Sequence, residues 1–269
     1  MYHLYKEPDI ISECKKRLKR FYGTVLNFDD NGKLCPQLAI MKYLSIKMRS
    51  NNNIKAIIFD VGRVLVNVDL DTVTNKLFSD IDGDTPDEVF KAIITNPLMK
   101  KYMKGLISPE QFYQGLSNLY ALNISYETFT EIWTSLFSPM PGMADLLKQI
   151  DRSLQLGLLS DTDPLHWTYL TKSFPHISQF KNMTLSFKVG IVKPNPKIYL
   201  LAAASVKTPP ESCLFIDDMQ RNIDGANSVG MHGIKFENVT QLTEALSEFS
   251  LLNISSTTTN KTSGTGYND

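Results

Sequence analysis

The sequence predicts an α/β fold in which a doubly wound parallel (Rossmann-like) sheet is interrupted by an inserted helical domain. From residue 141 onward, short apolar runs rich in β-branched residues alternate with helical segments joined by short links. Such alternation is typical of a parallel sheet covered by helices on both faces. Between residues 70 and 140 the apolar residues recur at helical spacing instead, which indicates a separate helical bundle. We therefore expect the sheet domain to comprise residues 54–69 and 141–249, with the insert at 70–140.

The composition fits a soluble globular protein with a sizeable core. Of the 269 residues, 42% are hydrophobic and 21% are charged. Lys plus Arg and Asp plus Glu both total 28, and a neutral chain does not favour nucleic acid or an anionic membrane as a partner. No apolar run is long enough to span a membrane, and residues 1–7 lack the order of a signal peptide. Cys14, Cys35 and Cys213 share no metal-ligand spacing, so we expect reduced thiols in a cytoplasmic protein.

Residues 1–53 are predicted to form a helical extension. Ile11, Cys14 and Leu18 fall on one helical face, opposite a basic cluster within residues 15–20. One interpretation of this basic face is a patch that binds a membrane surface or nucleic acid. Because the whole chain is neutral, we favour the alternative, in which the basic face is solvated and the helix packs on the rest of the protein.

Local signals predict the elements of the first half. Ile54–Asp60 is a short β-branched run ending in an acid, which predicts a buried parallel strand. Capping boxes at Thr85–Glu88 and Ser108–Gln111, each with proline at the first helical position, predict two helix starts in the insert. A further helix is predicted from a broad apolar stripe formed by Phe129, Ile132, Trp133, Leu136 and Phe137.

The second half is predicted to alternate between strands and helices. The predicted strands are 154–159, 183–186, 213–216 and 233–236, and the predicted helices are 143–150, one after Pro164, one from Pro196, 221–230 and 241–249. Residues 250–269 are rich in Ser, Thr, Asn and Gly and are expected to be a disordered tail. In doubly wound sheets, ligands bind beyond the carboxyl ends of the strands. Functional residues are therefore expected there.

Polar side chains do follow the predicted strands. Asp60 ends the first strand, Ser160-Asp161 ends the second, Lys193 follows the third, and Asp217-Asp218 ends the fourth. A single strand-ending Asp is often only the cap of the next helix, and a Lys before proline is usually a surface residue. Two adjacent acids after a buried strand repel each other unless a cation lies between them. Together these residues indicate one site at one edge of the sheet.

The segments that carry these residues resemble the four motifs of the haloacid-dehalogenase superfamily, in order and spacing, over residues 54 to about 237. The insert lies where that family carries its cap domain. Within the superfamily, the chain resembles the glucose-1-phosphate phosphatase-like subgroup, which has glycine two residues after the nucleophile. The segments that carry this closer resemblance are Asp60-Val61-Gly62-Arg63-Val64-Leu65, Gly105-Leu106-Ile107-Ser108, Gly190–Tyr199 and Asp217–Ala226.

The resemblance implies a Mg²⁺-dependent phosphatase in which Asp60 attacks phosphorus and forms an aspartyl-phosphate. Asn222 is expected to position the metal loop. The site residues that the resemblance implies are Asp60, the Gly62 carbonyl oxygen and Asp218 as metal ligands with Asp217 beside them, Asp60 and Lys193 for catalysis, and Ser160, Asp161 and Lys193 for the substrate.

Two positions depart from the family pattern. Most of its phosphatases carry a second Asp, which protonates the leaving group, where this chain has Gly62. A leaving group that departs without a proton, such as an anomeric sugar hydroxyl, suffers least. This favours a sugar 1-phosphate or another activated phosphate over a simple alkyl phosphate, and a sugar phosphate is the predicted substrate. Asp161 stands where the subgroup usually has Asn. It either supplies part of the missing acid–base function or, the interpretation we favour, forms a turn and caps the helix before Pro164.

The sequence is also compatible with other functions, and it leaves the roles of several further residues open. A catalytically silent binding protein would keep the fold and lose turnover, and Gly62 leaves that alternative open. A metal-independent 2-haloacid dehalogenase would not need the acid pair, and a phosphomutase would need the acid that Gly62 replaces. The weaker site candidates are His166 and Trp167, which face a cleft or pack on the domain; Asp69, a hinge or helix cap; and Met99, Tyr102 and Met103, which line a substrate pocket or belong to the core.

Overall fold

A computed structural model describes residues 54–78 and 86–253 of the chain. The predicted helical extension at 1–53, the start of the first capping box at Thr85 and most of the predicted tail lie outside these residues. The tail was predicted from residue 250, but described structure continues to Asn253: Leu251 is buried and Leu252 forms an antiparallel bridge with Ile150. Cys213 is a free, buried thiol.

Five parallel strands form the central sheet, which confirms the predicted α/β fold. Their order is β5-β4-β1-β6-β7, with β1 at Ala56–Phe59, β4 at Gln155–Ser160, β5 at Asn182–Leu185, β6 at Cys213–Asp217 and β7 at His232–Lys235. Every residue of β1 is buried, as expected for an apolar run that packs on both faces of a parallel sheet. Because β1 pairs with β4 and β6, the residue that follows β1 lies between the ends of two other strands.

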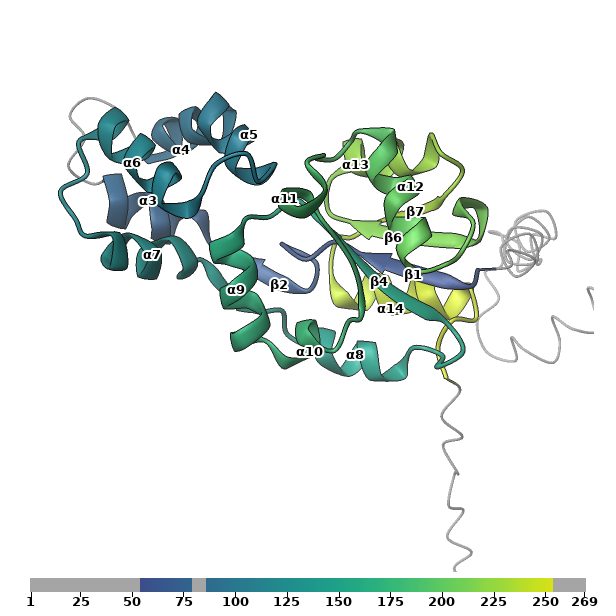
Figure 1. Cartoon of the computed structure of the whole chain (residues 1–269). Coiled ribbons are helices and arrows are strands. Elements are labelled where there is room, and N and C mark those ends of the chain that lie inside the picture. The colour runs from purple at the N-terminus through teal and green to yellow at the C-terminus, as the bar shows by residue number, and fades with distance from the viewer. Residues whose placement is uncertain (1–53, 79–85, 254–269) are drawn as a thin grey trace, which may run out of the picture. The chain divides into compact units, whose positions relative to one another are not determined.

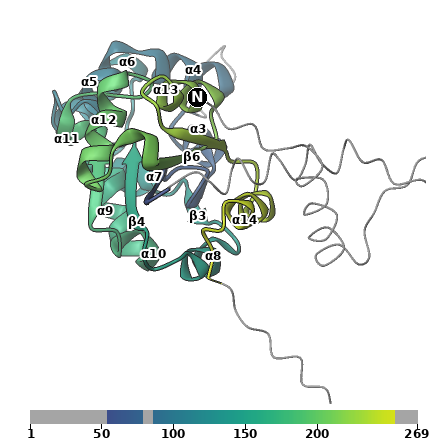
Figure 2. The same ribbon diagram turned by 90° about the vertical axis from the view of Figure 1, so that its right-hand side faces the viewer.

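Helices cover both faces of this sheet (Figures 1 and 2), with α12 and α13 on one face and α8 and α14 on the other. Under α12 and α13 lies a core that includes Tyr199 and Phe215, whose rings meet edge to face at 5.5 Å. The helical elements of this domain are α8 (Met143–Gln149), α9 (Pro164–Ser173), α10 (Pro175–Ser178), α11 (Ser186–Val189), α12 (Pro196–Ser205), η1 (Pro210–Ser212), α13 (Gln220–Asn227) and α14 (Val239–Glu248).

The helical insert has a core of its own. Its helices are α3 (Leu70–Phe78), α4 (Pro86–Thr95), α5 (Pro97–Met103), α6 (Pro109–Tyr120) and α7 (Tyr126–Thr134). Tyr102 stacks on Phe112 at 4.2 Å, and Phe129 stacks on Trp133 at 5.6 Å. The predicted capping box of α6 is confirmed: Gln111 N donates to the Ser108 hydroxyl, and Ser108 N donates to the Gln111 side chain.

The two segments that connect the sheet domain to the insert form a pair of strands that was not predicted. The apolar stripe predicted as one helix ends early, because α7 stops at Thr134 and Phe137 begins a strand, β3 (Phe137–Pro139). This strand pairs antiparallel with β2 (Val66–Val68). Helical periodicity could not reveal this pairing, since the backbone partners come from segments far apart in the sequence. Asp69 has the predicted capping role, with its carboxylate accepting hydrogen bonds from the Thr72 amide and hydroxyl at the start of α3.

Within residues 54–78 and 86–253, no helix combines the length and the apolar composition that crossing a bilayer requires.

Candidate active site

The predicted site residues meet at the carboxyl edge of the sheet. Asp60 directly follows β1, Ser160 ends β4 and Asp217 ends β6. Since the sheet is parallel and β1 is its central strand, the topology itself places Asp60 between the other two. Lys193 reaches the same point from the segment between α11 and α12.

Lys193 connects two of the carboxylates. Its Nζ lies 2.9 Å from Asp60 Oδ1 and 2.7 Å from Asp217 Oδ2, and all three residues are buried. Burial, opposed by the Lys193 ammonium and reinforced by Asp217, raises the pKa of Asp60 to about 7. Burial disfavours the charged form of Lys193, but the adjacent Asp60 and Asp217 outweigh it and raise the pKa of the lysine. Lys193 therefore carries its positive charge in the interior.

The two adjacent acids differ in what surrounds them. Asp217 is fully buried and accepts hydrogen bonds from the Asn222 amide at 2.9 and 3.0 Å and from Met219 N at 2.8 Å, in addition to Lys193. Asp218 is half-buried, and the half-exposed guanidinium of Arg63 lies 3.8 Å from its Oδ2. Burial, followed by repulsion from Asp217, raises the pKa of Asp218. Asp217 is thus held by the protein, whereas Asp218 keeps lone pairs for another partner.

The acids fit a divalent cation. Asp60, Asp217 and Asp218 each offer a carboxylate oxygen, and these oxygens lie within 4.8 Å of one another. Carboxylate oxygens are the ligands that Mg²⁺ prefers. A cation would also offset the repulsion that raises the pKa of Asp218. Gly62, predicted to contribute its carbonyl oxygen, lies two residues after Asp60, where its backbone bridges to Val66.

Asp161 does not cap the helix before Pro164, so the interpretation favoured from the sequence is wrong. Its Oδ1 accepts a hydrogen bond from the backbone N of Lys193 at 3.0 Å. The cap of α9 is Asp163, which accepts from Leu165 N and His166 N. The two segments converge only in the folded chain, so a local turn pattern could not reveal the contact. Burial, opposed by Lys193, raises the pKa of Asp161.

Sequence reasoning missed Ser186. Its hydroxyl accepts a hydrogen bond from Thr162 N and donates one to Thr162 O, both at 3.0 Å. Ser186, the first residue of α11, therefore fixes the end of the Ser160–Thr162 segment through the backbone of Thr162. No local signal distinguishes this serine from a helix cap, because its partner lies 24 residues away.

A buried polar network joins the sheet domain to the insert, and it was also missed. The Asp163 carboxylate lies 2.7 Å from His166 Nδ1 and accepts from Trp133 Nε1 at 3.4 Å. His166 Nε2 lies 2.9 Å from the Trp133 carbonyl oxygen, and the two rings stack in parallel. The Asp163-Pro164 pair is a helix-start signal that predicts the cap, although it does not predict the tryptophan.

Replacing Asp163 by Ala is expected to lower the free energy of unfolding at pH 7 by about 2–4 kcal/mol, because a helix cap is lost and buried donors lose their acceptor. Burial disfavours ionised Asp163, but His166 and the hydrogen bonds outweigh it, so its pKa is below the ordinary value. The stabilisation is therefore present above the unfolded pKa of about 4 and is lost as the pH falls through the folded pKa.

Urea unfolding followed by circular dichroism at pH 7 and in acid measures this difference. Asp145→Ala, at an exposed surface pair with Lys148, is the control and is expected to change little. Equal stability of the Asp163→Ala and wild-type proteins at pH 7 would contradict the role given to the network.

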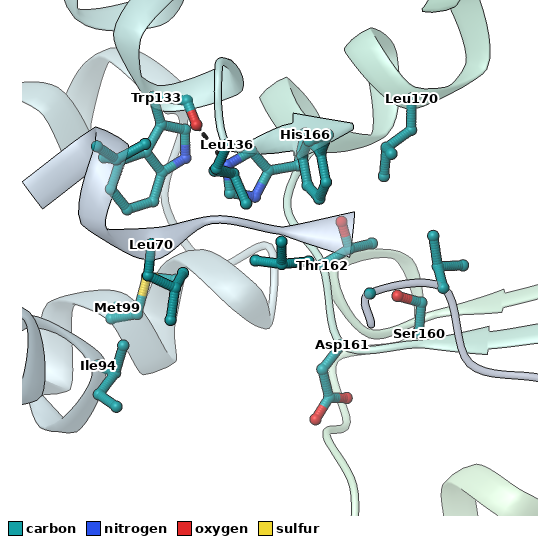
Figure 3. A pocket seen from close by; sticks show the side chains of 15 residues that line it. Leu70, Ile94, Met99, Trp133, Leu136, Ser160, Asp161, Thr162, His166 and Leu170 are labelled. Carbon is teal, nitrogen blue, oxygen red and sulfur yellow. Dashed lines mark hydrogen bonds between the residues drawn. The ribbon is translucent and has the colours of Figure 1, made fainter. Parts of the chain in front are cut away.

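A cavity of about 170 Å³ opens beside the carboxylates, between the insert and the sheet domain. Figure 3 shows Leu70, Ile94 and Met99 across from Ser160 and Asp161. Of the weaker candidates, Met99 and His166 line the cavity, while Tyr102 is fully buried in the core of the insert. The complete lining is Val61, Gly62, Val68, Leu70, Val73, Ile94, Met99, Trp133, Leu136, Phe137, Ser160, Asp161, Thr162, His166 and Leu170.

Comparison with known proteins gives a family and several relatives. A family model described as haloacid dehalogenase-like hydrolase matches residues 52–236. A D-ribitol-5-phosphate phosphatase of Bacteroides thetaiotaomicron is 24% identical over 69% of this chain and 93% of its own. Flavin mononucleotide hydrolase 1 of Arabidopsis thaliana is 28% identical over 56% of this chain and 61% of its own. A crystal structure of a HAD family enzyme from Bacteroides thetaiotaomicron, in complex with magnesium and inorganic phosphate, is 25% identical, with a TM-score of 0.59 over 70% of this chain and 98% of that one.

Proposed function

Since this chain belongs to the haloacid dehalogenase-like hydrolase family, we propose that it is a magnesium-dependent phosphatase that hydrolyses a small phosphate monoester through an aspartyl-phosphate on Asp60. The observation that carries this proposal is the contact of one buried lysine with two buried carboxylates, with Asp218 beside them. The similarity to phosphatases and to an enzyme crystallised with magnesium and phosphate supports it further.

In the proposed reaction, a carboxylate oxygen of Asp60 attacks phosphorus and displaces the leaving group. The Lys193 ammonium favours the ionised form of this carboxylate against the effect of burial and offsets the charge of the phosphoryl oxygens. Ser160 donates a hydrogen bond to one of those oxygens, and Ser186 holds the Ser160–Thr162 segment in place. Asp60, the Gly62 carbonyl oxygen and Asp218 would hold Mg²⁺, which neutralises phosphoryl charge when bound. Water then attacks the aspartyl-phosphate and releases phosphate.

Asp161 is proposed to contact substrate and to align the Lys193 backbone, given its hydrogen bond to that amide. Its part in acid–base chemistry stays a prediction, as do the sugar-phosphate substrate and the cytoplasmic location. We expect a small phosphorylated molecule, and no nucleic acid, as the partner of this neutral chain.

Phosphate release from a substrate panel tests the proposed function. The panel comprises glucose 1-phosphate, ribitol 5-phosphate, flavin mononucleotide and acetyl phosphate, each with Mg²⁺ and with excess EDTA. At least one substrate is expected to be turned over, and EDTA is expected to slow turnover by about 100-fold or more.

Other outcomes identify the rival functions. Halide release from 2-chloropropionate without Mg²⁺ would indicate a 2-haloacid dehalogenase. Isomerisation of a sugar phosphate would indicate a phosphomutase. A thermal shift with phosphate esters but no turnover of any of them would indicate a catalytically silent binding protein.

A further inference from the structure

The side chains that line the cavity beside the carboxylates indicate which leaving group the substrate carries. This inference rests on the proposed function. It is lined at one end by Gly62, Ser160 and Asp161 and at the other by residues of the insert. A phosphoryl group held at Ser160 therefore directs its leaving group into this cavity. The chemistry of the far walls decides which leaving groups are accommodated.

The far walls are made of hydrocarbon. Among the described lining residues, the insert contributes no charged side chain. Its contribution consists of Leu70, Val73, Ile94, Met99, Trp133, Leu136 and Phe137, and Val68 and Leu170 of the sheet domain lie nearby. Figure 3 shows Trp133, Leu136 and His166 together on the side away from Asp161.

The ring nitrogens of Trp133 and His166 do not make the far walls polar towards a substrate. Trp133 Nε1 donates to Asp163, and both nitrogens of His166 already have partners in Asp163 and the Trp133 carbonyl oxygen. A sugar hydroxyl next to the two rings and the aliphatic wall would exchange water for apolar contact, and besides these rings, Ser160 and Asp161, the only polar side chain that the described lining adds is the Thr162 hydroxyl. Each such unsatisfied polar group weakens binding. The walls therefore disfavour a polyhydroxylated leaving group.

The volume of the cavity and the lack of an acid at Gly62 further restrict the leaving groups that the site can accept. A cavity of roughly 150 Å³ lined by aliphatic and aromatic side chains accommodates benzene, and this one measures about 170 Å³. Gly62 provides no acid to protonate the departing oxygen. A phenol, with a pKa of about 10 like that of tyrosine, leaves as its anion far more readily than an alcohol, whose pKa is much higher and closer to that of water.

In place of the sugar phosphate predicted from the sequence, we infer that the substrates are phosphate monoesters of phenols. Asp60 attacks phosphorus, the P–O(aryl) bond breaks, and the electron pair leaves on the phenolate, which takes a proton from water. A second water adds to phosphorus, and the bond to Asp60 breaks. The carboxylate is restored, one proton of this second water stays on inorganic phosphate, and the other neutralises the hydroxide left when the phenolate was protonated. The products are a phenol and phosphate.

The test compares kcat/KM in Mg²⁺ for phenyl phosphate, glucose 1-phosphate, ribitol 5-phosphate and acetyl phosphate. Phenyl phosphate is expected to exceed both sugar phosphates by at least about tenfold. Acetyl phosphate has a small activated leaving group, so its turnover reports on the proposed function alone. If acetyl phosphate is turned over and the kcat/KM of either sugar phosphate equals or exceeds that of phenyl phosphate, the inference is overturned. The proposed function would then still hold. No turnover of any of the four compounds, acetyl phosphate included, would overturn both.

Variants of the cavity wall distinguish recognition of the phenyl group by the wall from the higher intrinsic reactivity of phenyl phosphate. Ile94 lines the cavity and is 44% exposed, so Ile94→Gln is expected to fold normally. It is expected to lower the ratio of kcat/KM for phenyl phosphate to that for acetyl phosphate by about tenfold, and Met99→Gln is expected to act in the same direction. Leu119→Gln, at a residue of α6 that is 56% exposed and absent from the lining, is the matched control. An unchanged ratio in both cavity variants would overturn the inference.

Discussion

Asp60→Asn is expected to reduce phosphate release by a factor on the order of 10⁴ or more, because the neutral amide is a poor nucleophile and no second carboxylate occupies its place. Asp217 cannot substitute for it, since its oxygens accept hydrogen bonds from Lys193, Asn222 and Met219. The measurement is the rate of phosphate release in Mg²⁺ from the best substrate of the panel.

Asparagine is the appropriate replacement because it keeps the shape of Asp60 and leaves Lys193 paired with Asp217. A thermal unfolding midpoint close to that of the wild type would show that the fold is kept. Trapping of labelled phosphate on the wild-type chain, and not on Asp60→Asn, would separate a nucleophile from a metal ligand. Full turnover by Asp60→Asn would end the phosphatase proposal.

Lys193→Met is expected to lower the free energy of unfolding by about 3–5 kcal/mol when Mg²⁺ is absent, because it leaves the buried Asp60 and Asp217 without their cation. Turnover is expected to fall by about 1,000-fold, as when one preorganised group that stabilises developing charge is removed. Methionine fills a similar volume, so the effect reports on charge more than on packing. Urea unfolding and phosphate release measure the two effects.

Lys197→Met is the matched control. Lys197 lies four residues further on, in the first turn of α12, and is exposed. This variant is expected to keep both the stability and the turnover of the wild type. If Lys193→Met were as stable and active as Lys197→Met, Lys193 would have no role in balancing the carboxylates.

The sequence by itself determined the parallel sheet and its order of elements along the chain. Short apolar runs such as Ile54–Asp60 can only be buried on both faces of a sheet, and their alternation with capped helices leaves few other folds. It also pointed to Asp60, Ser160, Lys193 and Asp217-Asp218, because parallel strands bring their carboxyl ends to one edge.

The tertiary structure alone decided the partners of these residues. The bond from Asp161 to the Lys193 amide, the support of Thr162 by Ser186 and the network of Asp163 with Trp133 all join segments that are distant in the sequence. Periodicity and capping signals act over one or two helical turns, so they carry no information on such contacts. The same reason explains why the cavity wall, formed by the insert and the sheet domain together, could be described only from the folded chain.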